Sequence, residues 1–320
     1  MADLAIRCQG LSKTYRLGLR ARRVDALQGL DLAVEAGTIY GFVGPNGAGK
    51  STTIKILVGL VAPSAGHAEL FGRPIADPRA RQAIGYLPEN PTFHDFMKPL
   101  EVMRYLGALS GLGGRALDRR ALELLEQVGL SRALDLTVRK FSKGMVQRLG
   151  LAQAVLHDPP LLILDEPMSG LDPMGRKEVR DLIVAQARRG KTIFFSTHIL
   201  NDVETICDRV GMVMGGRLVR EGALRSLFDG SVRAVEVRCS ALPPEVDSAL
   251  LAMATSGSTN PEGHAYLFPD HGAAHAALAR VVAAGASVLS VQPIRESLEE
   301  TFVRLAADTR ASDGGPPLHD

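Results

Sequence analysis

A glycine-rich stretch followed by a lysine and two hydroxyl residues runs from Gly44 to Thr52 and reads Gly-Pro-Asn-Gly-Ala-Gly-Lys-Ser-Thr. Its spacing matches G-x-x-x-x-G-K-[ST], in which successive backbone N–H groups point inward and form a nest for phosphate oxygens. Glycine permits backbone angles and close approaches that a Cβ atom would block. We expect Lys50 to reach the outer phosphates and Ser51 to offer its hydroxyl to a magnesium ion. The candidate phosphate-binding residues are Gly44, Pro45, Asn46, Gly47, Ala48, Gly49, Lys50, Ser51 and Thr52.

This loop stands between two segments of different character. Residues 38–43 before it form an apolar, strand-like run, and residues 52–60 after it have the pattern of a helix. The N-terminal dipole of that helix would also face the phosphates. An ordinary glycine-rich turn is the alternative, but a match of this length between a strand and a helix favours phosphate binding. The loop alone does not identify the nucleotide.

Two adjacent carboxylates, Asp165 and Glu166, follow the apolar run Leu161–Leu164. Such a run is typical of a buried parallel strand, and parallel strands bring their carboxyl ends to one edge of a sheet. We expect Asp165 to act on the magnesium shell and Glu166 to orient or deprotonate the attacking water near the γ-phosphate. Two acids at a solvated strand end are the alternative, which the upstream phosphate-binding loop disfavours.

Two further polar residues follow in the same region of the chain. Asp172 lies in the turn Ser169–Pro173, and His198 follows the strand-like run 192–196. A histidine at this edge of the sheet can donate a hydrogen bond to a γ-phosphate oxygen and so sense its presence. A lone histidine is more often structural, but its position at the same edge favours function.

A second candidate anion site lies upstream of the acid pair, in the segment Phe141–Arg148. Ser142 and Gly144 open a predicted helix, and a helix N-terminus attracts anions. One site already has its phosphate-binding loop, so a second phosphate binder would serve a different nucleotide, held by a partner copy. Ser-x-Gly before a helix is also a common cap, and that alternative stays open.

The order of the predicted elements indicates an α/β protein with two domains. Residues 1–229 alternate strands and helices as a P-loop nucleotide-binding core does, and residues from about 90 to 150 form an inserted helical subdomain. Residues 230–307 change to a small α+β pattern, with helices expected at 247–254, 273–284 and 297–306. Residues 308–320 are predicted to be disordered.

The bulk composition is that of an ordinary globular protein, with 46% hydrophobic residues, 22% charged residues and a net charge of +2. This balance gives no reason to expect nucleic acid as a partner. Cys8, Cys207 and Cys239 have no metal-ligand spacing, and their odd number indicates a reducing compartment. Because we find neither a signal peptide nor an apolar stretch of about 20 residues, we expect a cytoplasmic chain whose membrane role, if any, comes through a partner.

The densest basic patch consists of Arg16, Arg20, Arg22 and Arg23. We interpret it as a solvated loop between two strands, with contact to anionic lipid headgroups as the alternative.

In order and spacing, these motifs resemble those of the nucleotide-binding subunit of ATP-binding cassette (ABC) transporters, over residues 4 to about 224. The corresponding motifs are the Walker A loop described above, the signature Phe141–Met145, the Walker B strand Leu161–Pro167, the D-loop Ser169–Asp172 and the switch histidine His198. Tyr15 falls where that family stacks an aromatic ring on adenine. The set is specific, since coiled-coil DNA-repair relatives carry long heptad insertions that this chain lacks.

The resemblance implies an ATPase that uses ATP and Mg²⁺ and pairs head to tail with a second ATP-binding subunit, expected to be an identical copy. Each nucleotide would lie between Lys50 and Ser51 of one copy and the signature of the other. The signature residues that would face it are Ser142, Lys143, Gly144 and Met145. An integral-membrane permease would be the other partner, which implies a cytoplasmic chain held peripherally on the inner face of the cell membrane.

Two departures from the family pattern carry information. The usual signature is Leu-Ser-Gly-Gly-Gln, whereas this chain has Phe-Ser-Lys-Gly-Met, so that Lys143 adds a charge near the opposite nucleotide. The usual glutamine after the strand that ends at Leu87 is here Glu89, which can still approach the metal but adds negative charge near the phosphates. These variants and the α+β appendage resemble the export branch, in which a separate permease handles drugs, lipids or polysaccharides.

Two sets of alternatives stay open. The apolar Phe93, Phe96 and Met97 would either meet a coupling helix of the permease or pack under the helical subdomain. A soluble cassette ATPase that acts on ribosomes, DNA or a regulatory complex is the alternative function, although the translation-factor relatives usually carry two cassettes and this chain has one. A phosphate-loop kinase would leave the segment Phe141–Met145 unexplained.

Overall fold

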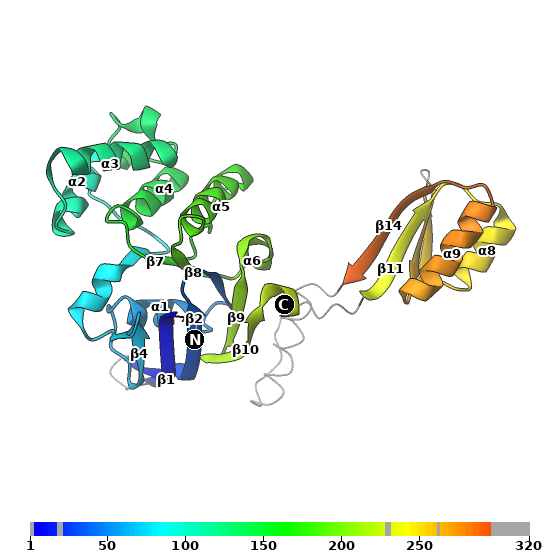
Figure 1. Ribbon diagram of the computed structural model, residues 1–320, viewed down its shortest axis with the longest axis horizontal. Helices are drawn as coiled ribbons and strands as arrows, with labels where there is room; N and C mark the ends of the chain where they lie inside the picture. Colours follow the sequence, from blue (N-terminus) through cyan, green and yellow to red (C-terminus); the bar gives the residue numbers. More distant parts are fainter. Residues whose placement is uncertain (1–2, 18–21, 228–231, 261–262, 296–320) are drawn as a thin grey trace. The chain divides into compact units, whose positions relative to one another are not determined.

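The computed structural model describes residues 3–17, 22–227, 232–260 and 263–295. Arg20, the helix expected at 297–306 and the tail from 308 lie outside these ranges. The chain divides into two compact units, Met1–Leu224 and Arg225–Asp320. Figure 1 colours the larger unit from blue to green and the smaller one from yellow to orange.

A six-stranded sheet forms the centre of the larger unit. Its strands lie in the order β10-β9-β3-β8-β7-β6, and all neighbours are parallel except the hairpin of β9 and β10. The strands are β3 Ile39–Val43, β6 Ile84–Leu87, β7 Leu161–Asp165, β8 Thr192–Thr197, β9 Arg209–Met214 and β10 Arg217–Ala223. Every residue of β3, β7 and β8 is buried, which explains their continuous apolar sequences. Gly215 and Gly216 turn the hairpin with positive φ angles of 52° and 78°.

An antiparallel sheet in the order β2-β1-β4-β5 lies beside this core. Its strands are β1 Leu4–Leu17, β2 Arg22–Glu35, β4 Ala65–Leu70 and β5 Arg73–Pro74. Ile6 and Leu30 of this sheet belong to one buried cluster with Ile54 of helix α1 and Phe194 of β8. The prediction of a basic loop was wrong for Arg16, Arg22 and Arg23, because β1 and β2 continue past their apolar residues. The ladder pairs Arg16 with Arg23 and Leu17 with Arg22.

Helices flank the central sheet and form the inserted subdomain. Their bounds are α1 Lys50–Leu57, α2 Pro99–Leu109, α3 Gly114–Gln127, α4 Lys143–Ala154, α5 Pro173–Ala187, α6 Leu200–Ile206 and α7 Leu224–Leu227, with short 3-10 helices at Pro78–Ala83, Ser131–Ala133 and Val138–Lys140. Figure 1 shows α2, α3 and α4 gathered together at one end of this unit. Leu117, Ala121, Leu124 and Leu125 form the buried stripe of α3, as helical periodicity requires.

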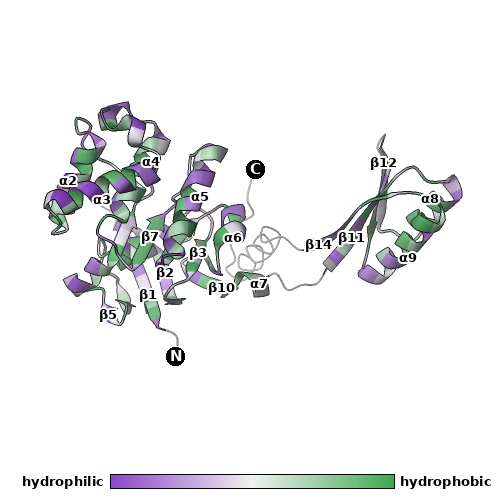
Figure 2. Ribbon diagram, turned by 45° about the horizontal axis from the view of Figure 1, so that its top comes forward, coloured by the Kyte–Doolittle hydropathy of each residue, from purple (hydrophilic) through white to green (hydrophobic). Residues whose placement is uncertain are grey.

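The smaller unit has the element order β11, α8, β12, β13, α9 and β14. The bounds are β11 Val232–Cys239, α8 Pro244–Leu251, β12 Ser256–Asn260, β13 Gly263–Phe268, α9 His271–Ala283 and β14 Val288–Arg295. The strands form one antiparallel sheet in the order β12-β13-β11-β14, with the two helices on the same face (Figure 2). Val237 and Phe268 of the sheet pack with Leu250 and Val281 of the helices in one core.

Among the helices that the structure describes, none combines the length and the hydropathy that a bilayer span requires.

Candidate active site

The glycine-rich loop joins the end of β3 to the start of α1. Gly47 and Gly49 have φ angles of 80° and 107°, in a region that favours glycine. A Cβ atom at Gly44 would meet the carbonyl oxygen of Val213, and one at Gly49 would lie 2.7 Å from that of Ala26. The loop is also tied to the β9–β10 turn, because the backbone N–H of Gly216 donates to the carbonyl of Ala48 at 3.0 Å.

Lys50, the first residue of α1, is buried although it is charged. Its Nζ atom donates to the carbonyl oxygen of Gly44 at 2.6 Å and to that of Pro45 at 3.3 Å. The same atom lies 3.4 Å from Oε1 of Glu166. These contacts offset the cost of burying the ammonium group, and they hold it inside the loop where the phosphate nest is expected.

Asp165 and two hydroxyl groups converge at the carboxyl edge of the sheet. Ser51 Oγ donates to Asp165 Oδ1 at 3.2 Å, and Ser196 Oγ donates to the same oxygen at 2.6 Å. The predicted pair Ser51 and Asp165 is thus brought together, and its oxygen atoms suit Mg²⁺, which is commonly bound by one or two carboxylates together with waters and phosphate oxygens. Burial, with Asp165 nearby, raises the pKa of the half-buried Tyr86 to about 12, so its phenol stays protonated beside this carboxylate.

Ser196 is a site residue that the motifs did not identify. It stands opposite Asp165 in the parallel ladder of β7 and β8, and its Oγ accepts a hydrogen bond from the backbone N–H of Glu166 at 3.0 Å. One hydroxyl therefore fixes both acids. The sequence contains one signal for Ser196. It is a hydroxyl residue near the end of a predicted strand that would lie next to the strand bearing the acids.

Glu166 is buried between a cation and an imidazole. Its Oε2 atom lies 2.9 Å from Nδ1 of His198, while its Oε1 atom faces Lys50. Its φ angle of 48° is unusual for a residue other than glycine, and such angles persist where the surroundings fix them. The His198 side chain remains 45% exposed, which leaves its ring accessible from the site. This arrangement holds one carboxylate in a single orientation, as a general base requires.

These residues surround a cavity of about 430 Å³. The predicted residues that line it are Pro45, Asn46, Gly47, Gly49, Lys50, Ser51, Thr52, Glu89, Glu166 and His198. Val24 and Ala26 of β2, which were not predicted, and Ser169 of the predicted D-loop complete the lining. Gly44, Ala48 and Asp165 belong to the surrounding structure and do not line it.

Tyr15, the predicted adenine-stacking residue, is not among the lining residues of this cavity. It is paired directly with Val24 across the β1–β2 ladder, and directly paired residues point to the same face of a sheet. The Nζ atom of Lys13 lies 5.1 Å from the centroid of the Tyr15 ring. The ring therefore shares a face with the apolar part of the cavity wall.

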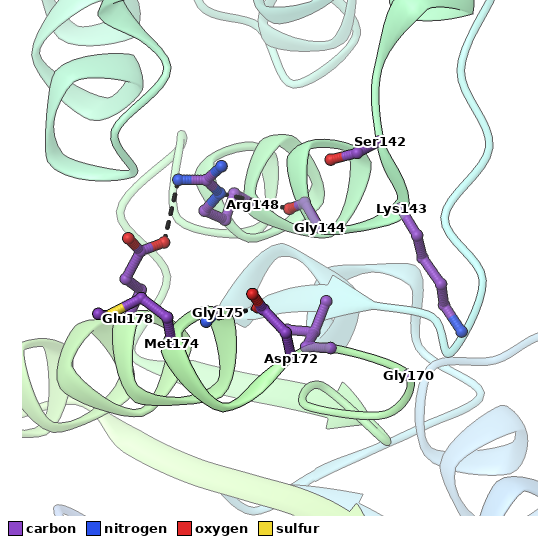
Figure 3. Close-up of a pocket in the computed structure, with 10 residues that line it drawn as sticks. Ser142, Lys143, Gly144, Arg148, Gly170, Asp172, Met174, Gly175 and Glu178 are labelled. Atoms are coloured by element: carbon purple, nitrogen blue, oxygen red, sulfur yellow. Dashed lines mark hydrogen bonds and ion pairs between the residues drawn. The ribbon is translucent and has the colours of Figure 1, made fainter.

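A second cavity of about 430 Å³ lies at the N-termini of α4 and α5 (Figure 3). Of the predicted residues, Ser142, Lys143, Gly144 and Asp172 line it, and Met145 does not. The cap interpretation of Ser142 is realised as well, because its Oγ accepts from the backbone N–H of Met145 at 3.3 Å.

The two cavities share no lining residue, and the D-loop runs between them. Ser169 lines the first cavity, and the next residue, Gly170, lines the second. The buried Gln147 of α4 donates to the carbonyl of Pro167 at 3.0 Å, which fastens the signature helix to the chain just after the two acids. Gln147 was not predicted as a site residue.

Asp202 of α6 is a third buried acid, after Asp165 and Glu166, in this part of the fold. Burial raises its pKa, while Arg176 and Arg180 of α5 act against that shift. Its Oδ2 atom and the Nε atom of Arg176 have no hydrogen-bond partner among the described residues. Arg176 and Arg180 therefore act on the Asp202 carboxylate through space.

The apolar segment before α2 is partly packed on the helical subdomain and partly exposed. Phe93 and Met97 line a cavity of about 230 Å³ together with Tyr105 of the helical subdomain. Phe96 is 74% exposed, and its ring stacks on His94 with the centroids 5.5 Å apart.

Comparisons with known proteins agree with these motifs. The sequence profile of a family described as ABC transporter matches residues 27–169. A Synechocystis protein described as an uncharacterized ABC transporter ATP-binding protein is 40% identical over 297 residues, which cover 92% of this chain and 82% of the relative. The bacitracin transport ATP-binding protein BcrA of Bacillus licheniformis is 44% identical over 60% of this chain and 63% of its own length.

Two solved structures show the same fold over most of the chain. An ATP-binding subunit of an ABC transporter superposes with a TM-score of 0.63 and 32% identity, covering 71% of this chain and 92% of that one. The dimeric ATP-binding cassette MJ0796 in a post-hydrolysis state with ADP and Pi superposes with a TM-score of 0.64 and 25% identity, covering 69% of this chain and 99% of that one.

Proposed function

We propose that this chain, which belongs to the ABC transporter family as an ATP-binding subunit that hydrolyses ATP, closes as a head-to-tail pair around ATP and thereby drives export through a separate membrane permease. The observation that carries this proposal is the presence of two cavities of equal volume that share no lining residue. The first is lined by the phosphate-binding loop and Glu166, and the second is lined by signature residues and Asp172 of the D-loop. A second copy of the chain would bring one of each together.

Within the first cavity, we assign the chemistry to groups that the fold holds in place. Lys50 would bind the outer phosphates, since its ammonium group is buried within the loop. Glu166 would orient the attacking water and take its proton, and His198, 2.9 Å away, would hold the carboxylate and bond to the γ-phosphate. A magnesium ion held by Ser51 and Asp165, with Glu89 as a further candidate, would supply positive charge against the triphosphate.

ATP would be bound across the pair. The partner copy would supply Ser142, Lys143, Gly144 and Met145 from its signature and Asp172 from its D-loop. The two helix N-termini that open into this cavity attract negative charge, which suits a phosphate. Hydrolysis would convert one polyanion into two that repel each other, and the pair would separate.

Two kinds of observation support the proposal of a separate permease and of transport in the export direction. Phe96 offers an exposed aromatic surface next to the helical subdomain, where a membrane partner could dock. Some relatives carry export or transport in their names, such as the Nod factor export ATP-binding protein I of Cupriavidus pinatubonensis, 38% identical over 63% of each chain. The chain would then work in the cytoplasm, peripherally bound to the inner face of the cell membrane.

We also assign residues 1–229 to the ATPase domain and residues 230–307 to an accessory α+β domain. The division of the chain into compact units near Leu224 supports this boundary. The accessory unit has its own buried core, as a separately folding domain would.

The test is a pull-down of the tagged Glu166→Gln chain from detergent-solubilised native membranes with ATP and magnesium, followed by mass spectrometry. A stoichiometric membrane protein with several transmembrane helices supports the proposal and identifies the permease. Recovery of soluble partners alone, with the chain absent from membranes, would instead favour a soluble ATPase with a regulatory role. The Lys50→Ala chain is the control for ATP dependence.

A further inference from the structure

The sheet of the smaller unit has two edges of opposite character. β12 forms one edge and reads Ser-Gly-Ser-Thr-Asn, whereas β14 forms the other and reads Val-Leu-Ser-Val-Gln-Pro-Ile-Arg. Four apolar side chains of β14 are between 38% and 57% exposed, namely those of Val288, Leu289, Val291 and Ile294. Val282, in the last turn of α9, is 64% exposed. The uncovered apolar surface of this unit is therefore concentrated on β14.

β14 has little of what usually protects a sheet edge. Among the described strands β11 is its only neighbour, so one row of its backbone groups faces no partner strand there. Natural edge strands are commonly very short or carry charged residues, above all lysine. β14 has eight residues and no charge from Val288 to Ile294, and its one proline, Pro293, removes a single N–H donor. Such an edge is a template for pairing with another strand.

The order of residues in β14 is self-complementary about Val291. In an antiparallel pair of two β14 strands centred there, Val291 would lie opposite its own counterpart. Ser290 would lie opposite Gln292, and Leu289 opposite Pro293. Apolar residues would meet apolar ones, polar residues would meet polar ones, and no like charges would oppose each other. A twofold contact requires a surface to match itself in this way, whereas a contact with an unrelated protein does not.

Such a pair would also continue the hydrophobic layer of the smaller unit. Val291 is paired with Val237 of the buried core, and directly paired residues point to the same face of a sheet. Val291 therefore lies on the face that α8 and α9 cover, at its outer margin. A twofold axis perpendicular to the sheet would join four strands from each copy and keep the helices of both copies on one side. The apolar margin of each copy would then be covered by that of the other.

We propose that the free edge of β14 is a dimer interface, on which the β14 strand of a second copy of this chain pairs antiparallel about Val291. The contact requires no nucleotide and involves neither cavity, so it is distinct from the proposed ATP-driven pair. An edge of eight residues buries little area, which places the contact among the weak interfaces when it acts alone. The ATP-driven pair would supply the second copy at a high local concentration.

The test is sedimentation equilibrium of the full chain without nucleotide, over a wide range of protein concentrations. Val291→Lys and Val291→Glu each place like charges opposite each other at the centre of the pair, whereas an equimolar mixture of the two variants places opposite charges there. Ser258→Lys is the matched control, because it adds a charge to an exposed residue of the other edge strand, β12. Thermal unfolding of each variant checks that the fold is unchanged.

We expect the wild-type and Ser258→Lys chains to dimerise equally, and each Val291 variant alone to associate at least about tenfold more weakly. The mixture of Val291→Lys and Val291→Glu should recover the association, because a twofold axis at this residue brings the two opposite charges together.

A wild-type chain that stays monomeric would overturn this inference, and so would Val291 variants that associate as Ser258→Lys does. A mixture that recovers no association would overturn the pairing about Val291. Dimers that form only after removal of residues 296–320 would show that this segment covers the edge of β14, which would also overturn the inference. The ATP-driven pair is unaffected by these outcomes, because it is measured separately with ATP and the Glu166→Gln chain.

Discussion

The Nδ1 atom of His198 lies 2.9 Å from Oε2 of Glu166, so the residue after β8 holds the residue after β7. Lys50 approaches the other oxygen of the same carboxylate at 3.4 Å. Lys50 at the start of α1 and His198 after β8 thus hold the Glu166 carboxylate between them at the edge of the phosphate-binding cavity.

Replacement of Glu166 by glutamine keeps the shape of the side chain and removes its basic oxygen. We expect turnover to fall by about 10²- to 10⁴-fold, the range typical of a lost general base, while ATP binding persists. Steady-state phosphate release and an equilibrium ATP titration measure the two effects. A Glu166→Gln chain that hydrolyses ATP at the wild-type rate would contradict the assignment.

Replacement of Lys50 by alanine should weaken ATP binding, because it removes a buried charge from the loop and leaves Glu166 without its cation. The expected loss is about 2 kcal/mol, the order of one hydrogen bond to a charged group. Fluorescence titration with ATP measures it. Lys55→Ala is the control, since Lys55 is an exposed lysine of the same helix. An unchanged ATP affinity in Lys50→Ala would contradict the assignment of Lys50 to phosphate binding.

Tyr15 tests the adenine end of the cavity. If its ring stacks on the base, Tyr15→Ala should cost about 1–3 kcal/mol of ATP binding, the range measured for base–aromatic stacking, and Tyr15→Phe should cost much less. The comparison of ATP with inorganic triphosphate separates base from phosphate contacts. Equal ATP affinity in Tyr15→Ala and wild type would contradict stacking by Tyr15 and would leave Val24 and Ala26 as the candidate adenine contacts.

Glu89 places a negative charge in the wall of the first cavity, where we propose that the phosphates bind. We expect Glu89→Gln to bind ATP several-fold more tightly without magnesium, and the gain to shrink when magnesium neutralises the triphosphate. Titrations with EDTA and with excess Mg²⁺ give the comparison. The exposed Glu123 lines neither cavity, so Glu123→Gln controls for net charge. A variant that binds less well with magnesium would indicate that Glu89 is a metal ligand.

A chain truncated after Asp229 tests the domain assignment. Because the larger unit contains both cavities and its own core, we expect it to unfold cooperatively and to bind ATP with the affinity of the full chain. Circular dichroism on heating and an ATP titration provide the readouts. Aggregation of the truncated chain would show that the accessory unit is required for folding of the ATPase unit.

The elements of the fold could be predicted from the sequence where one contiguous segment determines the local structure. The strand, glycine loop and helix around Lys50 are encoded locally, and so is the Gly215–Gly216 turn. The polar strand β12, Ser256–Asn260, was missed because its sequence has no apolar alternation and it exists by pairing with β13. The bond from Ser196 to Asp165 depends on the register of two strands, which no single segment specifies.

The same limit applies to the candidate site. The motifs identified the acids and His198, but the lining by Val24 and Ala26 arises from a distant strand that carries no motif. The division of the predicted residues between two cavities also depends on tertiary structure. The packing of Lys143 against Gly170 joins two segments separated in sequence by the whole of α4 and β7.

One peptide bond separates the lining of the first cavity at Ser169 from that of the second at Gly170. Consecutive Cα atoms are about 3.8 Å apart, so the loop cannot shift in one cavity without displacing the wall of the other. In the proposed pair, each copy would therefore link the wall around its own nucleotide to the wall around its neighbour's, so the two nucleotides would be coupled through a single residue step of this loop.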